Sequence, residues 1–261
     1  MRVALTGAAT GIGAALAARL KRDRHQITAF DIAEPAQHAD RWIRTDLGDP
    51  ASIDAAIAAT GGRFDALINN AGLPPRRGTA EQVLNVNFLG LRRFVNGMLD
   101  QLAPGASIVN TASRAARLWR ENIDEVRALM ALQTPSELGA FVARRGIDHI
   151  RAYDLSKEAL IVMTIAETEP LLARGLRMNC VSPAAVSTGI LDDFVTAFGA
   201  RATSAIARTG RPGTAEEVAD AIAFLAGPDS RWLKGAELVV DGGTAAMHQA
   251  DALGLRGPGA G

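Results

Sequence analysis

Three glycines follow a short apolar run at the start of the chain, and no other stretch limits the fold as strongly. Residues 2–6 have the composition of a buried strand, Gly7, Gly11 and Gly13 follow, and residues 14–20 are strong helix formers. In such an arrangement backbone N–H groups and the helix N-terminus can meet a diphosphate, because no Cβ holds it away. A plain tight turn is the alternative. The context favours a phosphate cradle within a βαβ fold.

An acidic residue ends the second predicted strand. Residues 26–30 form that strand, and Asp31 follows it. An acid in this position accepts hydrogen bonds from the two ribose hydroxyls of an adenosine and repels a 2′-phosphate, which selects NAD over NADP. Thr10 stands in the glycine loop where no basic residue occurs, in agreement with NAD. A solvated carboxylate at a strand end is the alternative.

Strands and helices alternate along the rest of the chain. Further strands are predicted at residues 42–45, 66–69, 107–111, 177–181 and 236–240. The segments between them are long enough for helical crossovers, which require a parallel sheet. We therefore predict an α/β fold with a doubly wound parallel sheet, formed by one domain over residues 1–251 and followed by a flexible tail at 252–261.

The only tyrosine of the chain lies four positions before one of its three lysines. Tyr153 and Lys157 would share one face of a helix, because residues i and i+4 stand one above the other. A nearby cation favours the phenolate and lowers the pKa of a phenol, so the pair could exchange protons near neutral pH. A half-buried tyrosine beside a solvated lysine is the alternative.

A serine follows the predicted strand 107–111. Ser113 lies just beyond its carboxyl end, where open α/β sheets place their ligands. Its hydroxyl could hydrogen-bond a substrate oxygen, whereas an ordinary turn serine is the alternative.

Charge and cysteine content exclude several classes of partner. The formal net charge is zero and the pI is about 6.9, so the chain has no basic footprint for nucleic acid or an anionic membrane. The single cysteine, Cys180, excludes an internal disulfide, and the four histidines have no spacing typical of a metal site. We expect a cytoplasmic protein without a signal peptide, a membrane span or a metal.

Taken together, these motifs resemble the short-chain dehydrogenase/reductase family. They are residues 6–13, Asn69-Asn70-Ala71-Gly72, Asn87, Ser113 and Tyr153-x-x-x-Lys157, in family order over nearly the whole chain. The resemblance implies one Rossmann domain of seven parallel strands that moves a hydride between a nicotinamide and a carbinol carbon. Tyr153 would be the general acid/base, and Ser113 would hold the substrate oxygen. Lys157 would bind the nicotinamide ribose and lower the pKa of Tyr153, and Asn87 would anchor a water that links Lys157 to solvent.

The same resemblance implies a set of residues that bind NAD. They are Gly7, Thr10, Gly11, Ile12, Gly13, Asp31, Asp46, Leu47, Asn69, Ala71, Gly72, Thr111, Tyr153, Lys157, Pro183, Val186 and Thr188. One position departs from the family pattern, because Ala184 stands where glycine is usual. If that position needs a positive φ, alanine costs about 1 kcal/mol or a little more.

An insertion separates Ser113 from Tyr153. Apolar residues recur at helical spacing from Trp119 to Met130, and Thr134-Pro135-Ser136-Glu137 is a capping box that opens a further helix. We predict a helical hairpin at about 114–148. It could wall an apolar substrate pocket or reshape a subunit contact, and the two roles are compatible. A homo-oligomer is expected, with a dimer favoured over a tetramer.

The stretch at about 189–212 corresponds to the mobile substrate lid of the family. It carries an apolar patch formed by Ile190, Leu191, Phe194, Val195 and Phe198, although a small interface helix is an alternative. Expected substrate contacts are Ser113, Trp119, Ile190 and Phe194. Residues 177–180, 190–196 and 230–232 resemble the family branch of coniferyl-alcohol dehydrogenases and 3α-hydroxysteroid dehydrogenase/carbonyl reductases.

The expected function is the NAD-dependent interconversion of a hydrophobic, aromatic or alicyclic alcohol and its carbonyl, as in the coniferyl-alcohol enzymes. A 3α-hydroxysteroid dehydrogenase/carbonyl reductase is the alternative within the enzyme class. A non-catalytic NAD-binding regulator is the alternative of another class, because fold does not dictate function.

Overall fold

The computed structural model describes residues 1–255. Of the predicted tail 252–261, residues 256–261 lie outside the described part, and Ala252 closes the last helix.

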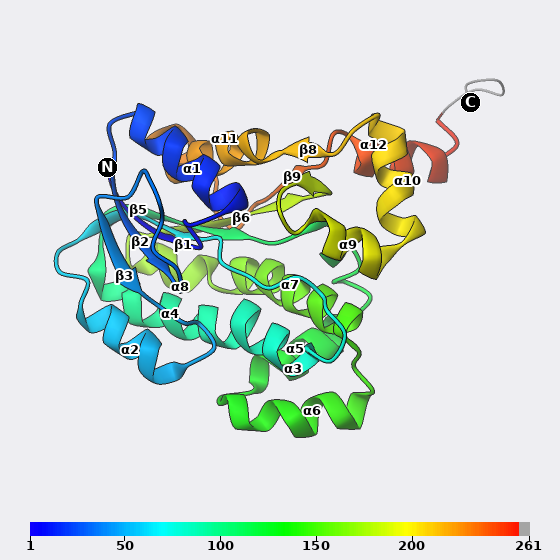
Figure 1. Ribbon diagram of the computed structural model, residues 1–261, viewed down its shortest axis with the longest axis horizontal. Helices are drawn as coiled ribbons and strands as arrows, with labels where there is room; N and C mark the ends of the chain where they lie inside the picture. The colour runs from blue at the N-terminus through cyan, green and yellow to red at the C-terminus, as the bar shows by residue number, and fades with distance from the viewer. Residues whose placement is uncertain (256–261) are drawn as a thin grey trace.

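Seven parallel strands form the centre of the molecule (Figure 1). Their order across the sheet is β3-β2-β1-β4-β5-β6-β9. The strands are β1 (Arg2–Thr6), β2 (Gln26–Asp31), β3 (Arg41–Arg44), β4 (Phe64–Asn69), β5 (Leu102–Thr111), β6 (Arg177–Pro183) and β9 (Glu237–Val240). The chain reverses direction across the sheet between β3 and β4, so the predicted doubly wound Rossmann fold is confirmed.

Helices cover both faces of the sheet. One face carries α1 (Gly11–Arg22) and α11 (Ala215–Ala226). The other carries α2 (Pro50–Ala58), α3 (Ala80–Leu84), η1 (Asn85–Gly90), α4 (Leu91–Met98), η2 (Leu99–Gln101), α7 (His149–Ala166) and α8 (Thr168–Ala173). The strands are apolar on both sides for this reason.

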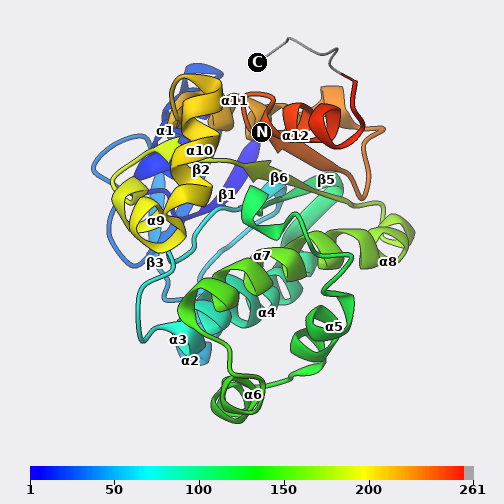
Figure 2. The same ribbon diagram turned by 90° about the vertical axis from the view of Figure 1, so that its right-hand side faces the viewer.

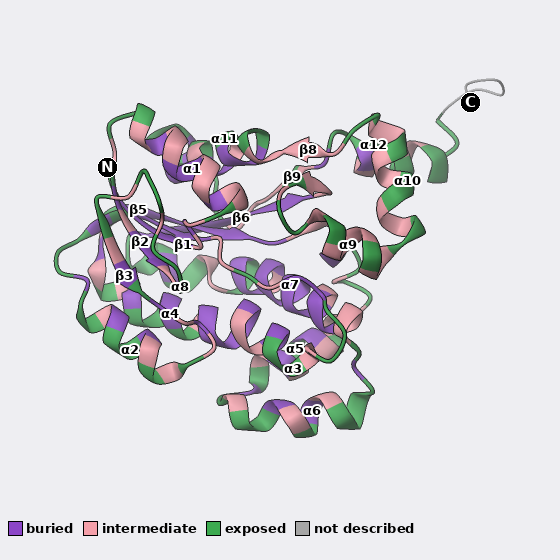
Figure 3. Cartoon of the chain, in the orientation of Figure 1, coloured by how far each residue is buried: buried purple, intermediate pink, exposed green. Residues whose placement is uncertain are grey.

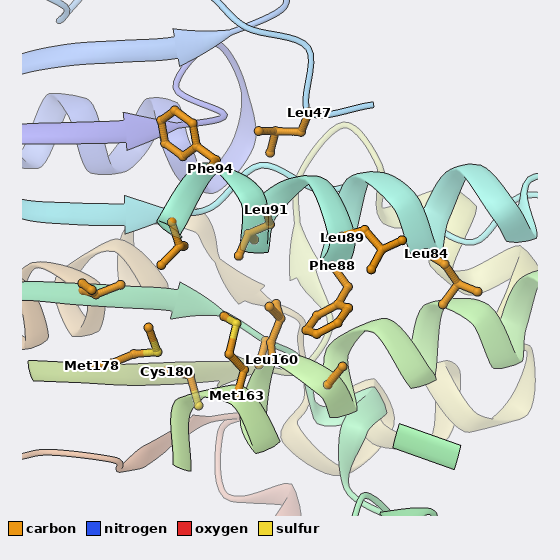
Figure 4. Packing of buried hydrophobic residues seen from close by; sticks show 14 of the residues in the cluster. Leu47, Leu84, Phe88, Leu89, Leu91, Phe94, Leu160, Met163, Met178 and Cys180 are labelled. Atoms are coloured by element: carbon orange, nitrogen blue, oxygen red, sulfur yellow. The ribbon is translucent and has the colours of Figure 1, made fainter. Parts of the chain in front are cut away.

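Alternation along the strands divides the core into two clusters. Val3 and Leu5 pack under α1 and α11, whereas Ala4 between them packs with α4 and α7 on the opposite face. Purple strands between partly green helices in Figure 3 show that the sheet is the most buried layer. Figure 4 shows the second cluster, in which Phe88 and Phe94 lie against the sheet with Leu160 and Met163.

Two additions lie on opposite sides of α7 (Figures 1 and 2). The predicted insertion forms η3 (Arg114–Ala116), α5 (Ile123–Ala131), η4 (Pro135–Glu137) and α6 (Leu138–Arg145). The predicted lid forms β7 (Val186–Ser187), α9 (Leu191–Phe198), α10 (Ala200–Thr209) and β8 (Gly213–Thr214). The short η5 (Pro228–Ser230) precedes β9, and α12 (Thr244–Ala252) follows it.

Local signals in the sequence account for several element ends. Asp49 caps α2 by accepting a hydrogen bond from Ala51 N at 2.9 Å. The capping boxes at Thr134 and Thr214 both form, although the first opens a short 3₁₀ turn before α6. Within residues 1–255 no helix is long and apolar enough to cross a membrane.

Candidate active site

The glycine loop is packed so closely that side chains cannot replace its hydrogens. Gly7 has φ +69°, and a Cβ there would lie 2.7 Å from Ala71 Cα. A Cβ on Gly13 would lie 1.8 Å from Gly7 O. Gly11 has φ +55° and faces Thr188, whose Cγ2 lies 3.4 Å from the Cβ position. The loop therefore adjoins the start of the lid, as expected for two walls of one cofactor site.

The N-terminus of α1 suits an anionic group. Its N-cap residue Thr10 makes no side-chain capping hydrogen bond, and the first turn contains no acidic residue. The positive end of the helix dipole and its N–H groups are therefore not compensated by the helix's own side chains. Ile12 lies in this first turn. These residues fit the diphosphate of a dinucleotide.

Asp31 lies beside the glycine loop. Its Oδ2 accepts a hydrogen bond from Ala9 N at 2.9 Å, and its Oδ1 accepts one from Ala33 N at 3.1 Å. Asp46 bonds to Gly48 N at 2.7 Å, and the neighbouring Leu47 is buried. Both carboxylates thus stand on fixed turns after β2 and β3.

The segment after β4 joins the cradle to the centre of the sheet. Asn69 is completely buried, and its Nδ2 donates to Asn110 Oδ1 at 2.8 Å, so its side chain links β4 to β5. Any cofactor contact of Asn69 would come from its backbone. Asn70, which was not assigned a role, donates from Nδ2 to Gly7 O at 3.1 Å. Ala71 N donates to Thr6 Oγ1 at 3.1 Å.

Tyr153 and Lys157 lie on α7, which Asp148 caps through Arg151 N at 2.7 Å. Lys157 Nζ is 5.8 Å from the centroid of the Tyr153 ring, and both side chains are buried. The ammonium donates a hydrogen bond to Thr111 O at 2.8 Å, at the end of β5. The helix and the neighbouring strand therefore bring the predicted pair together.

The predicted fall in the pKa of Tyr153 is wrong for this environment. Burial raises the pKa of the phenol well above its ordinary value, and a hydrogen bond with Ser113 offsets part of that increase. Burial also lowers the pKa of the Lys157 ammonium to about 8. Desolvation penalises the charged form of each group, and this effect exceeds their mutual influence.

Ser113 lies at the start of η3, directly after β5. Its Oγ accepts a hydrogen bond from Ala115 N at 3.1 Å, and the Tyr153 hydroxyl is its other partner. Thr111 Oγ1 bonds to Asn70 Oδ1 at 3.4 Å. The structure thus places Ser113 against Tyr153 although the two residues are forty positions apart in the sequence.

Asn87 lies in η1, a π-helical turn between α3 and α4. Its Oδ1 accepts a hydrogen bond from Leu73 N at 2.7 Å, and its Nδ2 donates to Leu73 O at 3.0 Å. A Cβ on Gly72 would lie 3.2 Å from Asn87 Oδ1 and 3.4 Å from Lys157 Nζ. The absence of a side chain at Gly72 therefore lets Asn87 and Lys157 approach each other. Such π-turns are frequent at functional sites.

Pro183 ends β6, and the segment that follows it carries Val186 and Thr188. Val186 and Ser187 form β7, which pairs with β8. Ala184 N donates to Val240 O at 3.2 Å. Among residues 1–255 only Arg24 and His38 combine a side chain with positive φ, so Ala184 carries no left-handed strain. The free-energy cost expected for an alanine with positive φ therefore does not arise at Ala184.

The lid places two aromatic rings on Tyr153. The centroids of Phe194 and Phe198 lie 5.2 and 6.0 Å from that of Tyr153, in edge-to-face contacts. Ile190 stands at the start of α9 and is partly exposed. Phe198 was placed on the apolar patch but not among the substrate contacts. Phe198 lies four positions after Phe194, and this spacing places the two rings on the same face of the helix.

The insertion packs against the core and against two helices of the domain. Trp119 packs against the core cluster below the sheet and stacks on the Arg120 guanidinium at 4.2 Å. Helix α5 packs on α7, and α6 packs on α3. Figure 2 shows both helices on the side of α7 opposite the lid. The pocket wall and the subunit contact both stay predictions for the insertion.

A cavity lies behind the lid. Its volume is about 370 Å³, and its lining includes Val186, Ile206, Arg211 and Val240. Tyr153, Ser113 and Lys157 do not line it. Within residues 1–255 no group of three or more histidine, cysteine, aspartate or glutamate side chains could hold a metal ion.

Sequence families match both halves of the chain. Residues 2–123 match a family described as short chain dehydrogenase, and residues 137–245 match one described as enoyl-(acyl carrier protein) reductase. The chain is 36% identical over 251 residues to coniferyl-alcohol dehydrogenase of a Pseudomonas species, covering 95% of this chain and 97% of that protein. It is 29% identical over 256 residues to 3-alpha-hydroxysteroid dehydrogenase/carbonyl reductase of Comamonas testosteroni, covering 94% and 96%.

A solved structure agrees with these matches. The 3-alpha-hydroxysteroid dehydrogenase of Pseudomonas sp. B-0831, crystallised in complex with NADH, superimposes with a TM-score of 0.81. The two chains are 31% identical, and the match covers 96% of this chain and 99% of the other.

Proposed function

Because the chain belongs to the short-chain dehydrogenase family, we propose that it is an NAD-dependent oxidoreductase that interconverts a hydrophobic alcohol and its carbonyl. One observation carries the proposal. The only phenol of the chain lies at the carboxyl edge of a Rossmann sheet, between Ser113 and Lys157 and under two aromatic rings of the lid. A site of this kind can exchange a proton with a substrate oxygen while excluding water.

The cofactor site fits NAD. The glycine loop and the uncapped N-terminus of α1 would hold the diphosphate, and Asp31 would accept hydrogen bonds from the ribose hydroxyls. A 2′-phosphate would meet the Asp31 carboxylate, so NADP is disfavoured. When bound, the dinucleotide supplies or accepts the hydride at its nicotinamide ring. Lys157 would hold the ribose nearest that ring, with Val186 and Thr188 opposite.

Proton transfer belongs to the side chains of α7 and η3. In oxidation Tyr153 would take the hydroxyl proton of the alcohol while Ser113 holds the same oxygen. In reduction the phenol would return the proton, for which its raised pKa suits it. Lys157 titrates near pH 8, so it can pass a proton onward at physiological pH. Asn87 is fixed by Leu73 and would anchor the water on that route.

The substrate class follows from the lid. Phe194 and Phe198 present an apolar surface to Tyr153, and Ile190 stands at the start of the same helix, which suits an aromatic or alicyclic alcohol. The relative that acts on coniferyl alcohol makes a cinnamyl-type alcohol our first candidate. A 3α-hydroxysteroid is the second, because the structural neighbour named for such a substrate covers nearly the whole chain.

The experiment is an assay of NADH formation on mixing the protein with NAD and cinnamyl, alicyclic and steroidal alcohols. We expect turnover with at least one class, and lower efficiency with NADP. Tyr153→Phe should reduce turnover at least a hundredfold while NAD binding, followed by fluorescence, is retained. NAD binding without turnover of any alcohol by the natural protein would favour the non-catalytic regulator instead.

Assembly and location complete the proposal. Helices α5 and α6 cover faces of α7 and α3 that remain open without the insertion, and a dimer is the assembly that we propose. Light scattering would distinguish it from a tetramer. Dependence on NAD is in keeping with a cytoplasmic enzyme.

A further inference from the structure

A single guanidinium from the lid bridges the two segments that carry Tyr153 and Ser113. Arg201, near the start of α10, donates from Nη1 to Asp154 Oδ2 at 2.8 Å and from Nη2 to Ala115 O at 3.0 Å. Asp154 is the residue after Tyr153 on α7, and Ala115 N donates to Ser113 Oγ. The lid is therefore bonded to the immediate neighbours of both groups that face the substrate oxygen.

The same arginine also organises the aromatic surface of the lid. Its Cζ lies 4.6 Å from the centroid of the Phe198 ring, and Phe198 in turn contacts Tyr153. Gly199, between the two, has φ +49° and separates α9 from α10. Ring and guanidinium thus reach the site from two successive helices joined at one glycine.

Asp154 needs this cation. Its side chain is 15% exposed, and its Oδ1 has no hydrogen-bond partner within residues 1–255. Burial raises the pKa of this carboxyl, whereas Arg201 and Arg151 lower it and Glu158 raises it further. A buried carboxylate that loses its partner is strongly destabilised. The Asp154 charge is therefore tolerated here chiefly through Arg201.

The pair also acts on the phenol. The charge of Asp154 raises the pKa of Tyr153, and the charge of Arg201 lowers it. Ser113 lowers it as well, and Lys157 on the same helix lies 5.8 Å from the ring centroid. With the lid closed, the charge of Arg201 offsets part of the effect of Asp154 on the hydroxyl. With Arg201 withdrawn, Asp154 alone would oppose formation of the phenolate.

We propose that Arg201 is a positioning residue that couples closure of the lid to the alignment and ionisation of the Ser113–Tyr153 pair. This inference rests on the proposed oxidoreductase function. It goes beyond shielding of the substrate, since the lid then takes part in setting the proton chemistry. An alcohol that does not let α9 and α10 close would meet a misaligned serine and a tyrosine that ionises less readily.

A second ion pair of the lid provides the matched control. Arg76 donates from Nε and Nη2 to Asp193 at 3.0 and 2.8 Å, which fastens α9 to the loop after β4. This pair contacts neither the Tyr153 nor the Ser113 segment. Arg76→Met should therefore loosen the lid alone, whereas Arg201→Met should loosen it and also disturb the pair.

We expect Arg76→Met to raise KM for the alcohol with less than a twofold change in kcat. Arg201→Met should lower kcat about tenfold or more. In oxidation, the pH at which kcat/KM reaches half its plateau should be lower in Asp154→Asn/Arg201→Met than in Arg201→Met, by about half a pH unit. Both of these variants lack the Arg201 guanidinium and its hydrogen bonds, so the comparison isolates the effect of the Asp154 charge.

A readout independent of turnover is available because Tyr153 is the only tyrosine. In protein labelled with ¹³C-tyrosine, the ring signal should begin to move toward tyrosinate at lower pH in the double variant than in Arg201→Met. Two results together would overturn the proposal: equal kcat in Arg76→Met and Arg201→Met, and identical pH profiles in Arg201→Met and in Asp154→Asn/Arg201→Met. An absence of NAD-dependent turnover in the natural protein would instead refute the proposed function, with the ¹³C comparison still deciding the electrostatic part.

Discussion

Lys157 donates a 2.8 Å hydrogen bond to the carbonyl oxygen of Thr111, so the catalytic helix is fastened to the end of the central strand β5 by the ammonium itself. The lysine is buried, and this bond is the only hydrogen bond of its ammonium to the protein among residues 1–255. Its remaining N–H donors are therefore available to a ribose and a water, as the proposed mechanism requires.

This burial gives a pH dependence of stability. The pKa of Lys157 falls from 10.5 to about 8 on folding, so above pH 8 the unfolded chain holds a proton that the folded protein has released. The free energy of unfolding should therefore rise between about pH 8 and pH 10, by up to about 3 kcal/mol. Urea unfolding of the natural protein and of Lys157→Met measures it. Curves that remain parallel over this range would show that Lys157 is not the group responsible.

Asp31 should determine cofactor preference. Asp31→Asn retains the size of the side chain and removes the charge that repels a 2′-phosphate. The ratio of kcat/KM for NADP to that for NAD should rise about tenfold or more, since removing a unit charge a few ångströms away is worth over 1 kcal/mol. Asp49→Asn, which alters the cap of α2, should leave the ratio unchanged. A similar change in both variants would contradict the ribose role of Asp31.

Gly13 should not accept a side chain. The Cβ of Gly13→Ala would lie 1.8 Å from Gly7 O, so the backbone of the loop must move, and we expect a loss of about 3 kcal/mol in stability and weaker NAD binding. Gly139→Ala in α6 is the control, because the nearest atoms there are Glu81 carboxylate oxygens at 3.4 Å. It should stabilise the protein by about 0.5–1 kcal/mol. Equal melting temperatures of the two variants would be incompatible with this account.

Arg151 of the catalytic helix pairs with a buried carboxylate on the same helix and with a carboxylate of the insertion. Arg151 contacts Glu158 at 2.6 Å and Glu125 of α5 at 2.7 Å, and the Glu158 side chain is only 1% exposed. Arg151→Met would leave the buried Glu158 carboxylate without its cation, although Asn122 Nδ2 still donates to it at 2.7 Å, and should cost about 3–5 kcal/mol.

The exposed pair of Arg127 with Asp124 provides its control. These groups lie 3.7 Å apart with side chains 73% and 96% exposed, so Arg127→Met should cost less than about 0.5 kcal/mol. Denaturant unfolding measures both variants. Similar decreases in the free energy of unfolding would mean that the buried pair stabilises the protein no more than the exposed one.

The sequence by itself determined those features that depend on neighbouring residues. The glycine loop, the capping residues Asp49 and Thr214 and the spacing of Tyr153 and Lys157 act over a few positions, and the fold class follows from their alternation with apolar strands. The parallel sheet and the location of the site at its carboxyl edge were predictable for the same reason.

Only the tertiary structure decided those properties that depend on burial and on contacts between residues far apart in the sequence. The pKa of Tyr153 rises, against our prediction, because desolvation depends on how completely the lid and the core enclose the phenol. The side chain of Asn69 turned out to bond within the sheet, and Arg201 to bridge segments 47 and 86 positions away. No local pattern contains such contacts, since they exist only after helices far apart in the chain have packed on one sheet.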